Sequence, residues 1–133
     1  MAIVFIMALA TIAALIISLQ GTTTQKTTDV FLHNQAKLIA KSATGYAILA
    51  ISAHSIKDNG NCIKKIDLTF NKIYDVHIAI RYLGSDFPSS CPMLDNSIET
   101  RESNATAIID VLVEVNDPTL PPVTYVRRSL QKL

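Results

Sequence analysis

Aromatic and charged residues are scarce in this 133-residue chain, and each shortage excludes a class of protein. Tryptophan is absent, Phe and Tyr number four each, and charged residues make up 17% of the chain. Twelve Lys and Arg against eleven Asp and Glu leave a net charge of +1, which excludes a strongly basic nucleic-acid binder. Because 49% of the residues are hydrophobic, neither a disordered tail nor a coiled coil is expected.

Motifs that carry chemistry are also missing. The sequence has no HExxH, Gly-rich phosphate loop, nucleophile elbow or CxxC, and its three histidines, His33, His54 and His77, are far apart. The two cysteines lack the neighbouring ligands that would complete a zinc site. We therefore expect no enzyme, with no catalytic residue, no cofactor and no metal. Residues 58–133 hold 8 basic and 10 acidic side chains, a net charge of −2, so no nucleic-acid partner is expected.

The most prominent feature is an uncharged apolar run at the N-terminal end. No charged side chain precedes Lys26. At about 1.5 Å per residue, roughly 20 helical residues span the 30 Å hydrocarbon core of a bilayer. Residues 1–25 are therefore predicted to form a transmembrane helix segment. Its principal apolar residues are Ile3, Val4, Phe5, Ile6, Leu9, Ile12, Leu15 and Ile16.

A cleaved secretory signal is the competing interpretation of this run. Signal peptides place an apolar region of about 7 to 15 residues behind a positive one, whereas this run is longer and no Lys or Arg precedes it. A processed N-terminus that has lost a basic leader explains the missing basic flank. The polar remainder of the chain is then expected outside the cytoplasm.

An amphipathic helix is predicted over residues 26–57. The Thr-rich stretch over residues 22–28, beyond Gly21, precedes its regular part, and the β-branched residues there predict a weak or locally unwound region. Lys57, Asp58, Asn59 and Gly60 form the predicted helix end. Spacings of three and four residues place one apolar face on Leu32, Ala36, Ile39, Ala43, Tyr46 (or Ala47) and Ala50.

The hydrophobic period changes from 3.6 to 2 after Gly60, which predicts an exported β-sheet domain over residues 58–133. Four strands are expected, near 62–70, 74–83, 109–115 and 123–130. Asn71 and Lys72 indicate a tight hairpin between the first two. The predicted fold class is α+β: the second half of a long N-terminal helix packs on a four-stranded antiparallel sheet that is too small to bury a core by itself.

Cys62 and Cys91 are the only cysteines. An even count, an exported chain and a Pro-rich loop that needs a tether favour a disulfide between them over two free thiols.

Taken together, these features resemble a type IV pilin or pseudopilin. The resemblance covers the whole chain in architecture, and the stretch Met1-Ala2-Ile3-Val4-Phe5-Ile6-Met7-Ala8-Leu9-Ala10-Thr11-Ile12-Ala13-Ala14-Leu15 resembles pilin N-terminal helices in composition. It implies a structural subunit of a bacterial surface filament, a homo-oligomer that polymerises through its apolar helix. Family filaments often unwind this helix partway, and we expect such a break at Gly21; a simple membrane boundary there is the other interpretation.

The resemblance also implies partners and a location. Subunits are expected in the bacterial inner membrane before assembly, as single-pass proteins, and then in an extracellular filament; a pilus assembly machinery and a prepilin peptidase are the implied partners. Two alternatives stay open. One is a minor pseudopilin of a type II secretion system, and the other is a single-pass membrane-anchored periplasmic binding domain.

One short motif suggests a surface modification. Asn104, Ala105 and Thr106 match the N-x-Ser/Thr sequon, and Glu102 precedes the Asn by two residues, which resembles the bacterial acceptor pattern. Asn104 is therefore a candidate N-glycosylation site.

Overall fold

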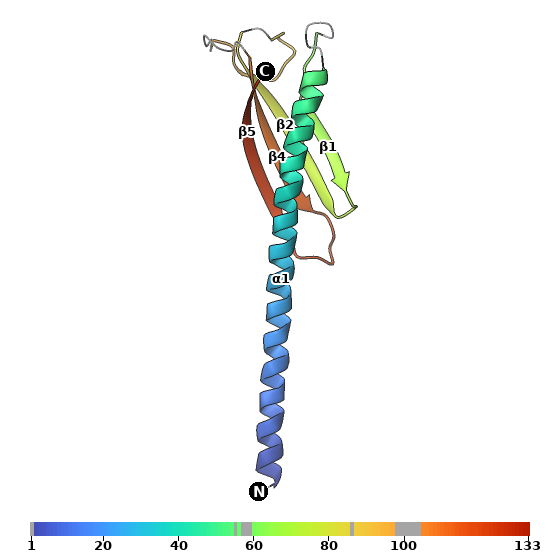
Figure 1. The fold of residues 1–133 in the computed structure, drawn as a ribbon, viewed down its shortest axis with the longest axis vertical. Coiled ribbons are helices and arrows are strands. Elements are labelled where there is room, and N and C mark those ends of the chain that lie inside the picture. Colours follow the sequence, from blue (N-terminus) through green and yellow to red (C-terminus); the bar gives the residue numbers. More distant parts are fainter. Residues whose placement is uncertain (1, 55, 57–59, 86, 98–104) are drawn as a thin grey trace.

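The chain folds into one long helix and a β-sheet, which confirms the predicted α+β class (Figure 1). The structure is a computed structural model that describes residues 2–54, 56, 60–85, 87–97 and 105–133. Its elements are α1 (Ala2–Ala53), β1 (Lys65–Phe70), β2 (Tyr74–Leu83), β3 (Met93–Asp95), β4 (Thr106–Val115) and β5 (Thr124–Lys132). The N-terminus and the C-terminus lie at opposite ends of this elongated molecule.

Helix α1 is 52 residues long and continuous, so the local unwinding predicted over residues 22–28 is wrong for the single chain. A helical Gly costs about 1 kcal/mol relative to Ala, which one uninterrupted ladder of backbone hydrogen bonds tolerates. Threonines also support the helix locally, since the Thr28 hydroxyl donates to the Thr24 carbonyl at 3.0 Å. The regular helix ends at Ala53, four residues before the end of the predicted range 26–57.

The sequence predicts a membrane-spanning segment over residues 1–25. Within the part of the chain that the structure describes, no helix is both long and apolar enough to cross a membrane.

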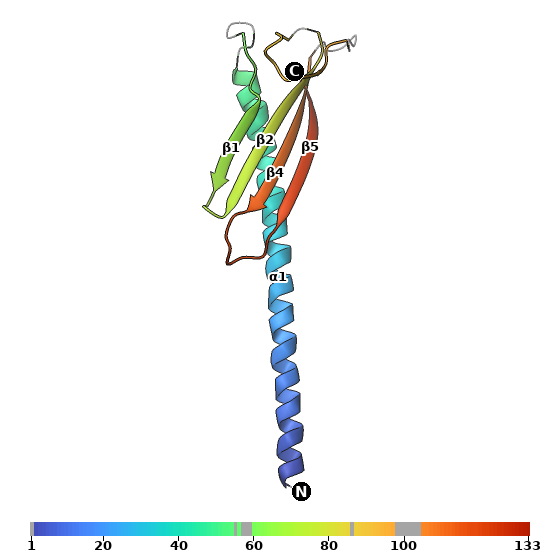
Figure 2. The same cartoon turned by 180° about the vertical axis from the view of Figure 1, so that it is seen from behind.

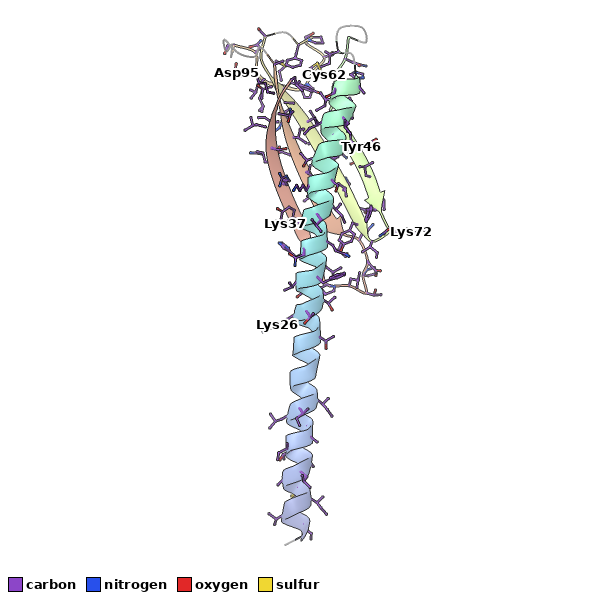
Figure 3. The ribbon with its side chains drawn as sticks, viewed as in Figure 1. Lys26, Lys37, Tyr46, Cys62, Lys72 and Asp95 are labelled. Atoms are coloured by element: carbon purple, nitrogen blue, oxygen red, sulfur yellow. A yellow bond between two sulfur atoms is a disulfide. The ribbon has the colours of Figure 1, made fainter. Side chains whose placement is uncertain are left out.

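Helix α1 divides into two parts by its contacts. Residues 2–23, the projecting half, extend beyond the sheet, whereas residues 24–53, the packed half, lie against it. The boundary lies where the loop that contains Thr119, Leu120 and Pro121 meets the helix at Thr24. Figure 3 places Lys26 close to this boundary.

The buried face of the packed half agrees with the predicted face at Leu32, Ala36, Ala43 and Ala47, the stated alternative to Tyr46. It differs by one residue at two positions, where Ala40 and Ile51 are buried in place of the predicted Ile39 and Ala50. The complete buried set is Leu32, Ala36, Ala40, Ala43, Thr44, Ala47 and Ile51. Alanine lets the helix backbone approach the sheet closely, so the small side chains face the strands and the larger ones lie on the flanks.

Four antiparallel strands form the body of the sheet in the order β1-β2-β4-β5. Successive side chains along β2 and β4 point alternately to the inner and the outer face of the sheet. The two strands supply these buried residues of the inner face: Tyr74, Val76, Ile78, Ile80, Tyr82, Ala107, Ile109, Val111 and Val113. Polar groups also join helix and sheet: the Tyr74 hydroxyl donates to Gln35 Oε1 at 2.8 Å, and the rings of His33 and Tyr125 meet edge-on at 5.5 Å.

The predicted number of strands is wrong, because the three-residue β3 makes a fifth. It pairs with the end of β2 in parallel, with Met93 opposite Tyr82. Such a short strand in a Pro-rich loop has no alternation that a sequence pattern could reveal. The first strand also begins at Lys65 rather than near residue 62.

The hairpin between β1 and β2 turns where the sequence predicts. Asn71 and Lys72 both have positive φ, 53° and 59°, as a two-residue turn matched to the strand twist requires. The turn closes with the Ile73 amide donating to the Phe70 carbonyl at 3.2 Å. β1 and β5 lie at the two edges of the main sheet.

Candidate assembly surfaces

The projecting half presents large apolar side chains that no other described part of the chain covers. The predicted core residues Ile3, Val4, Ile6, Leu9, Ile12, Leu15 and Ile16 have exposed fractions between 50% and 76%. The side chain of Phe5 lies outside the described residues. Figure 3 shows that no other described element lies beside this part of the helix. Contiguous apolar surface of this extent is typical of a protein or membrane contact site.

An apolar groove runs beside the packed half, on the β1 side of the helix. Its volume is about 550 Å³, within the range of roughly 300–1,000 Å³ that is typical of binding sites. Its apolar lining includes Leu38, Ile39 and Tyr46 from α1 and Leu68, Phe70 and Val76 from the sheet. The polar lining residues are Gln35, Ser42 and Thr69, so none of the groove residues is charged.

The position of α1 on the sheet creates this groove. The helix packs mainly on β4 and β5, with a smaller contact to β2, so the inner side of β1 extends past it. Leu68 and Phe70 on β1 are consequently 37% and 50% exposed, although they point to the apolar face. Figure 3 shows Tyr46 on the flank of α1 that faces β1.

The groove was not predicted as a site, yet part of its signal is in the sequence. Ile39 and Tyr46 belong to the predicted apolar face of the helix, and Leu68 and Phe70 to the predicted apolar face of the first strand. The lateral offset between helix and sheet, which no periodicity encodes, leaves these two flanks uncovered.

The disulfide predicted between Cys62 and Cys91 is present, with the two Cα atoms 5.1 Å apart. Both cysteines are buried, and the bond ties the start of the β-domain to the loop after β2. The Tyr82 hydroxyl donates to the Ile63 carbonyl at 3.0 Å, and the Tyr82 ring contacts that of Phe87 at 4.9 Å. Burial raises the pKa of Tyr82, so its phenol stays protonated as a donor. Figure 3 places Cys62 at this end of the domain.

An ion triad on the outer face fixes the register of three strands. Asp110 on β4 accepts from Arg81 on β2 and from Arg128 on β5, the latter through Nε at 2.5 Å and a second nitrogen at 3.1 Å. The hydrogen bond from Arg128 has the largest effect and, with that from Arg81, holds the pKa of Asp110 below its usual value. Burial acts on this pKa in the opposite direction, with a smaller effect than the Arg128 hydrogen bond. Figure 2 shows this side of the sheet, opposite to α1.

A smaller ion cluster lies at the β1 edge. His77 Nδ1 is 2.6 Å from Asp67 Oδ1, and Lys65 Nζ is 3.0 Å from the other carboxylate oxygen. The hydrogen bond with His77, followed by that from Lys65, lowers the pKa of Asp67. Among the described residues, no group of three His, Cys, Asp or Glu side chains could hold a metal ion.

Two further predicted sites have different outcomes. Gly21 lies in continuous helix, and a Cβ added at this position would meet nothing within 4 Å. The candidate glycosylation residue Asn104 lies outside the described residues, just before β4.

No family model, no curated protein and no solved structure matches this chain.

Proposed function

We propose that this chain is a structural subunit of a type IV pilus-like surface filament and that it polymerises through the projecting half of α1. The observation that carries the proposal is the exposure of one large apolar side chain after another along residues 3–17, at the end of a helix whose other half is rigidly held by a sheet. Burying this surface between copies removes apolar area from water.

A filament suits this surface better than a closed pair of subunits. The projecting half is about 33 Å long and its apolar residues are exposed on all of its sides, so several neighbouring helices are needed to cover it. Small residues at Ala8, Ala10, Ala13 and Ala14 allow such helices to approach closely. Before assembly, the uncharged segment lies in the bacterial inner membrane. Its transfer from lipid to neighbouring helices replaces one apolar environment with another, at little cost in free energy.

Imaging of purified protein tests the proposal directly. Helical filaments with a rise of a few ångström are expected once detergent is removed. Monodisperse single subunits under the same conditions would contradict it and favour a membrane-anchored binding domain. Fractionation of cells that lack filaments tests the membrane location: unassembled subunits are expected with the inner membrane and not in the soluble fraction.

A charge in the projecting half is expected to block assembly. In Ala10→Asp a carboxylate is buried without a partner in the helix bundle, which costs several kcal/mol, whereas the exposed position leaves the single subunit folded. Ala53→Asp introduces the same group at an exposed position of the same helix and serves as the control. Normal filaments from Ala10→Asp would exclude a bundled core at this position.

A further inference from the structure

We propose that the groove between α1 and β1 receives the projecting half of α1 from a second copy of this chain. This inference rests on the proposed function and deepens it, because it names the surface on which the exposed helix is buried. The proposal concerns one specific contact between unlike surfaces of two identical subunits.

The uncharged, mostly apolar lining of the groove favours an apolar occupant without charge. All of its lining residues are uncharged, and Leu38 and Phe70 are 65% and 50% exposed within it. A charged segment placed there would lose its hydration without gaining a partner. The lining polar groups Gln35, Ser42 and Thr69 lie among apolar side chains and offer only neutral contacts.

The projecting half has the matching properties. It is uncharged along its whole length, since the first charged residue of the chain is Lys26. Its described apolar side chains from Ile3 to Ile17 are exposed. The groove runs beside the segment Gln35–Tyr46 of α1, which corresponds to about three helical turns or 18 Å. A helix about 33 Å long therefore spans the groove and extends past it.

The geometry predicts how the two copies are displaced. Ala13 lies at the middle of the projecting half, and Ala40 lies at the middle of the segment Gln35–Tyr46. If these two midpoints are level and the helices run parallel, the copies are offset by about 40 Å along the helix axis. The contact joins two different surfaces, so it is heterologous, and the pair of copies still offers one free groove and one free helix. Repetition of such a contact gives an open filament rather than a closed dimer.

Cysteine cross-linking tests the contact in assembled material. Because both native cysteines are engaged in the Cys62–Cys91 disulfide, single introduced thiols report cleanly. Filaments are mixed from Ala13→Cys copies and Ser42→Cys copies, and oxidation is expected to give covalent dimers. Ser52→Cys, an exposed serine of the same helix outside the groove, is the matched control and is expected to give at least tenfold fewer dimers.

A second pair of variants measures what the groove contributes. Leu38→Glu places a charge in the groove, whereas Leu49→Glu makes the same change at a leucine of the same helix that is outside it and 70% exposed. Filament yield is expected to fall at least tenfold for Leu38→Glu and to stay within twofold of the wild type for Leu49→Glu. Circular dichroism of both single subunits checks that they remain folded.

The outcomes separate this inference from the proposed function. If the wild type forms no filaments, the proposed function fails. If it does, but Leu38→Glu assembles normally or Ser52→Cys cross-links as well as Ser42→Cys, only the groove contact is wrong. Protection of Ser42→Cys from a thiol reagent in single subunits would show a small apolar molecule in the groove, which would also overturn the contact.

Discussion

The two halves of α1 are both regular helix, but they differ in which side chains are buried and which are exposed. In the packed half, the residues that face the sheet are mostly alanines, and Ala36, Ala40 and Ala47 are completely buried. In the projecting half, large residues such as Ile3 and Leu9 are exposed by more than half. In the packed half, small residues mark the face that already has a close partner, the sheet. In the projecting half, large apolar residues on all sides form a continuous surface that no other described part of the subunit covers.

The disulfide gives the largest expected effect, and it is confined to the packed half and its sheet. Replacing both Cys62 and Cys91 with alanine is expected to lower the free energy of unfolding by about 3–4 kcal/mol, because the bond closes a loop with a sequence separation of 29. Urea denaturation followed by circular dichroism measures the change, and chemical reduction of the wild type should reproduce it. A loss below about 1 kcal/mol would show that helix packing alone holds the domain.

One substitution made in both halves tests the comparison itself. Ala40→Leu is expected to destabilise the subunit by about 1–3 kcal/mol, because the added carbons meet a close-packed sheet. Ala13→Leu should change the stability of the single subunit by less than about 0.5 kcal/mol, because its site is exposed. Thermal melts of both variants give the answer. Equal effects at the two positions would mean that the projecting half has a partner within the subunit.

The outer-face ion triad predicts a smaller, pH-dependent effect. Asp110→Asn should cost about 1 kcal/mol at neutral pH, since the carboxylate is only partly exposed but Arg128 is largely so. The folded-state pKa of Asp110 is lowered, so its contribution is full above the unfolded value near 3.9. It is lost as the pH falls through the lower folded value.

Melts of wild type and variant should therefore converge below about pH 4. Glu114→Gln, which neutralises another carboxylate on β4 and leaves the triad intact, is the control for the loss of one negative charge. Curves for Asp110→Asn that run parallel to the wild type down to about pH 2 would contradict the role of the triad.

Gly21→Ala is expected to have the smallest effect on the subunit. A methyl group fits there, because nothing lies within 4 Å of it. The helix should gain about 0.5–1 kcal/mol, seen as reduced fraying of the projecting half in hydrogen exchange. Filament yield then sharpens the comparison: a loss indicates that assembly needs the helix to unwind at Gly21, whereas unchanged yield indicates that it assembles as one rod.

Short-range patterns predicted most of the sheet. Strict alternation identified β2, β4 and β5, whose faces differ sharply in burial, and Asn71 with Lys72 identified the one turn that needs two positive φ angles. The disulfide followed from having only two cysteines in a chain that needed a tether. Each of these features is set by neighbours in the sequence or by chemistry that has a single solution.

Features that depend on how elements lie against each other were missed. The helix face shifted from Ile39 to Ala40, and of the two alternatives Tyr46 and Ala47 the smaller residue is buried, because close packing favours small residues, which hydrophobicity ranks lower. Ile39 and Tyr46 line the groove instead, and the lateral offset of helix and sheet that opens it has no signal in the periodicity. β3 was not predicted because its pairing with β2 depends on the path of a loop in the folded chain.

The two edge strands restrict how copies can join. β1 carries Lys65 and Asp67, and β5 carries Arg127, Arg128 and Lys132, so strands of two copies aligned edge to edge at β5 would bring like charges together. Charged edge strands of this kind resist the edge-to-edge pairing of strands that leads to aggregation. Charged strands at the edges of the sheet, beside an apolar helix that is open to solvent, therefore direct association away from the strand edges and towards the helix.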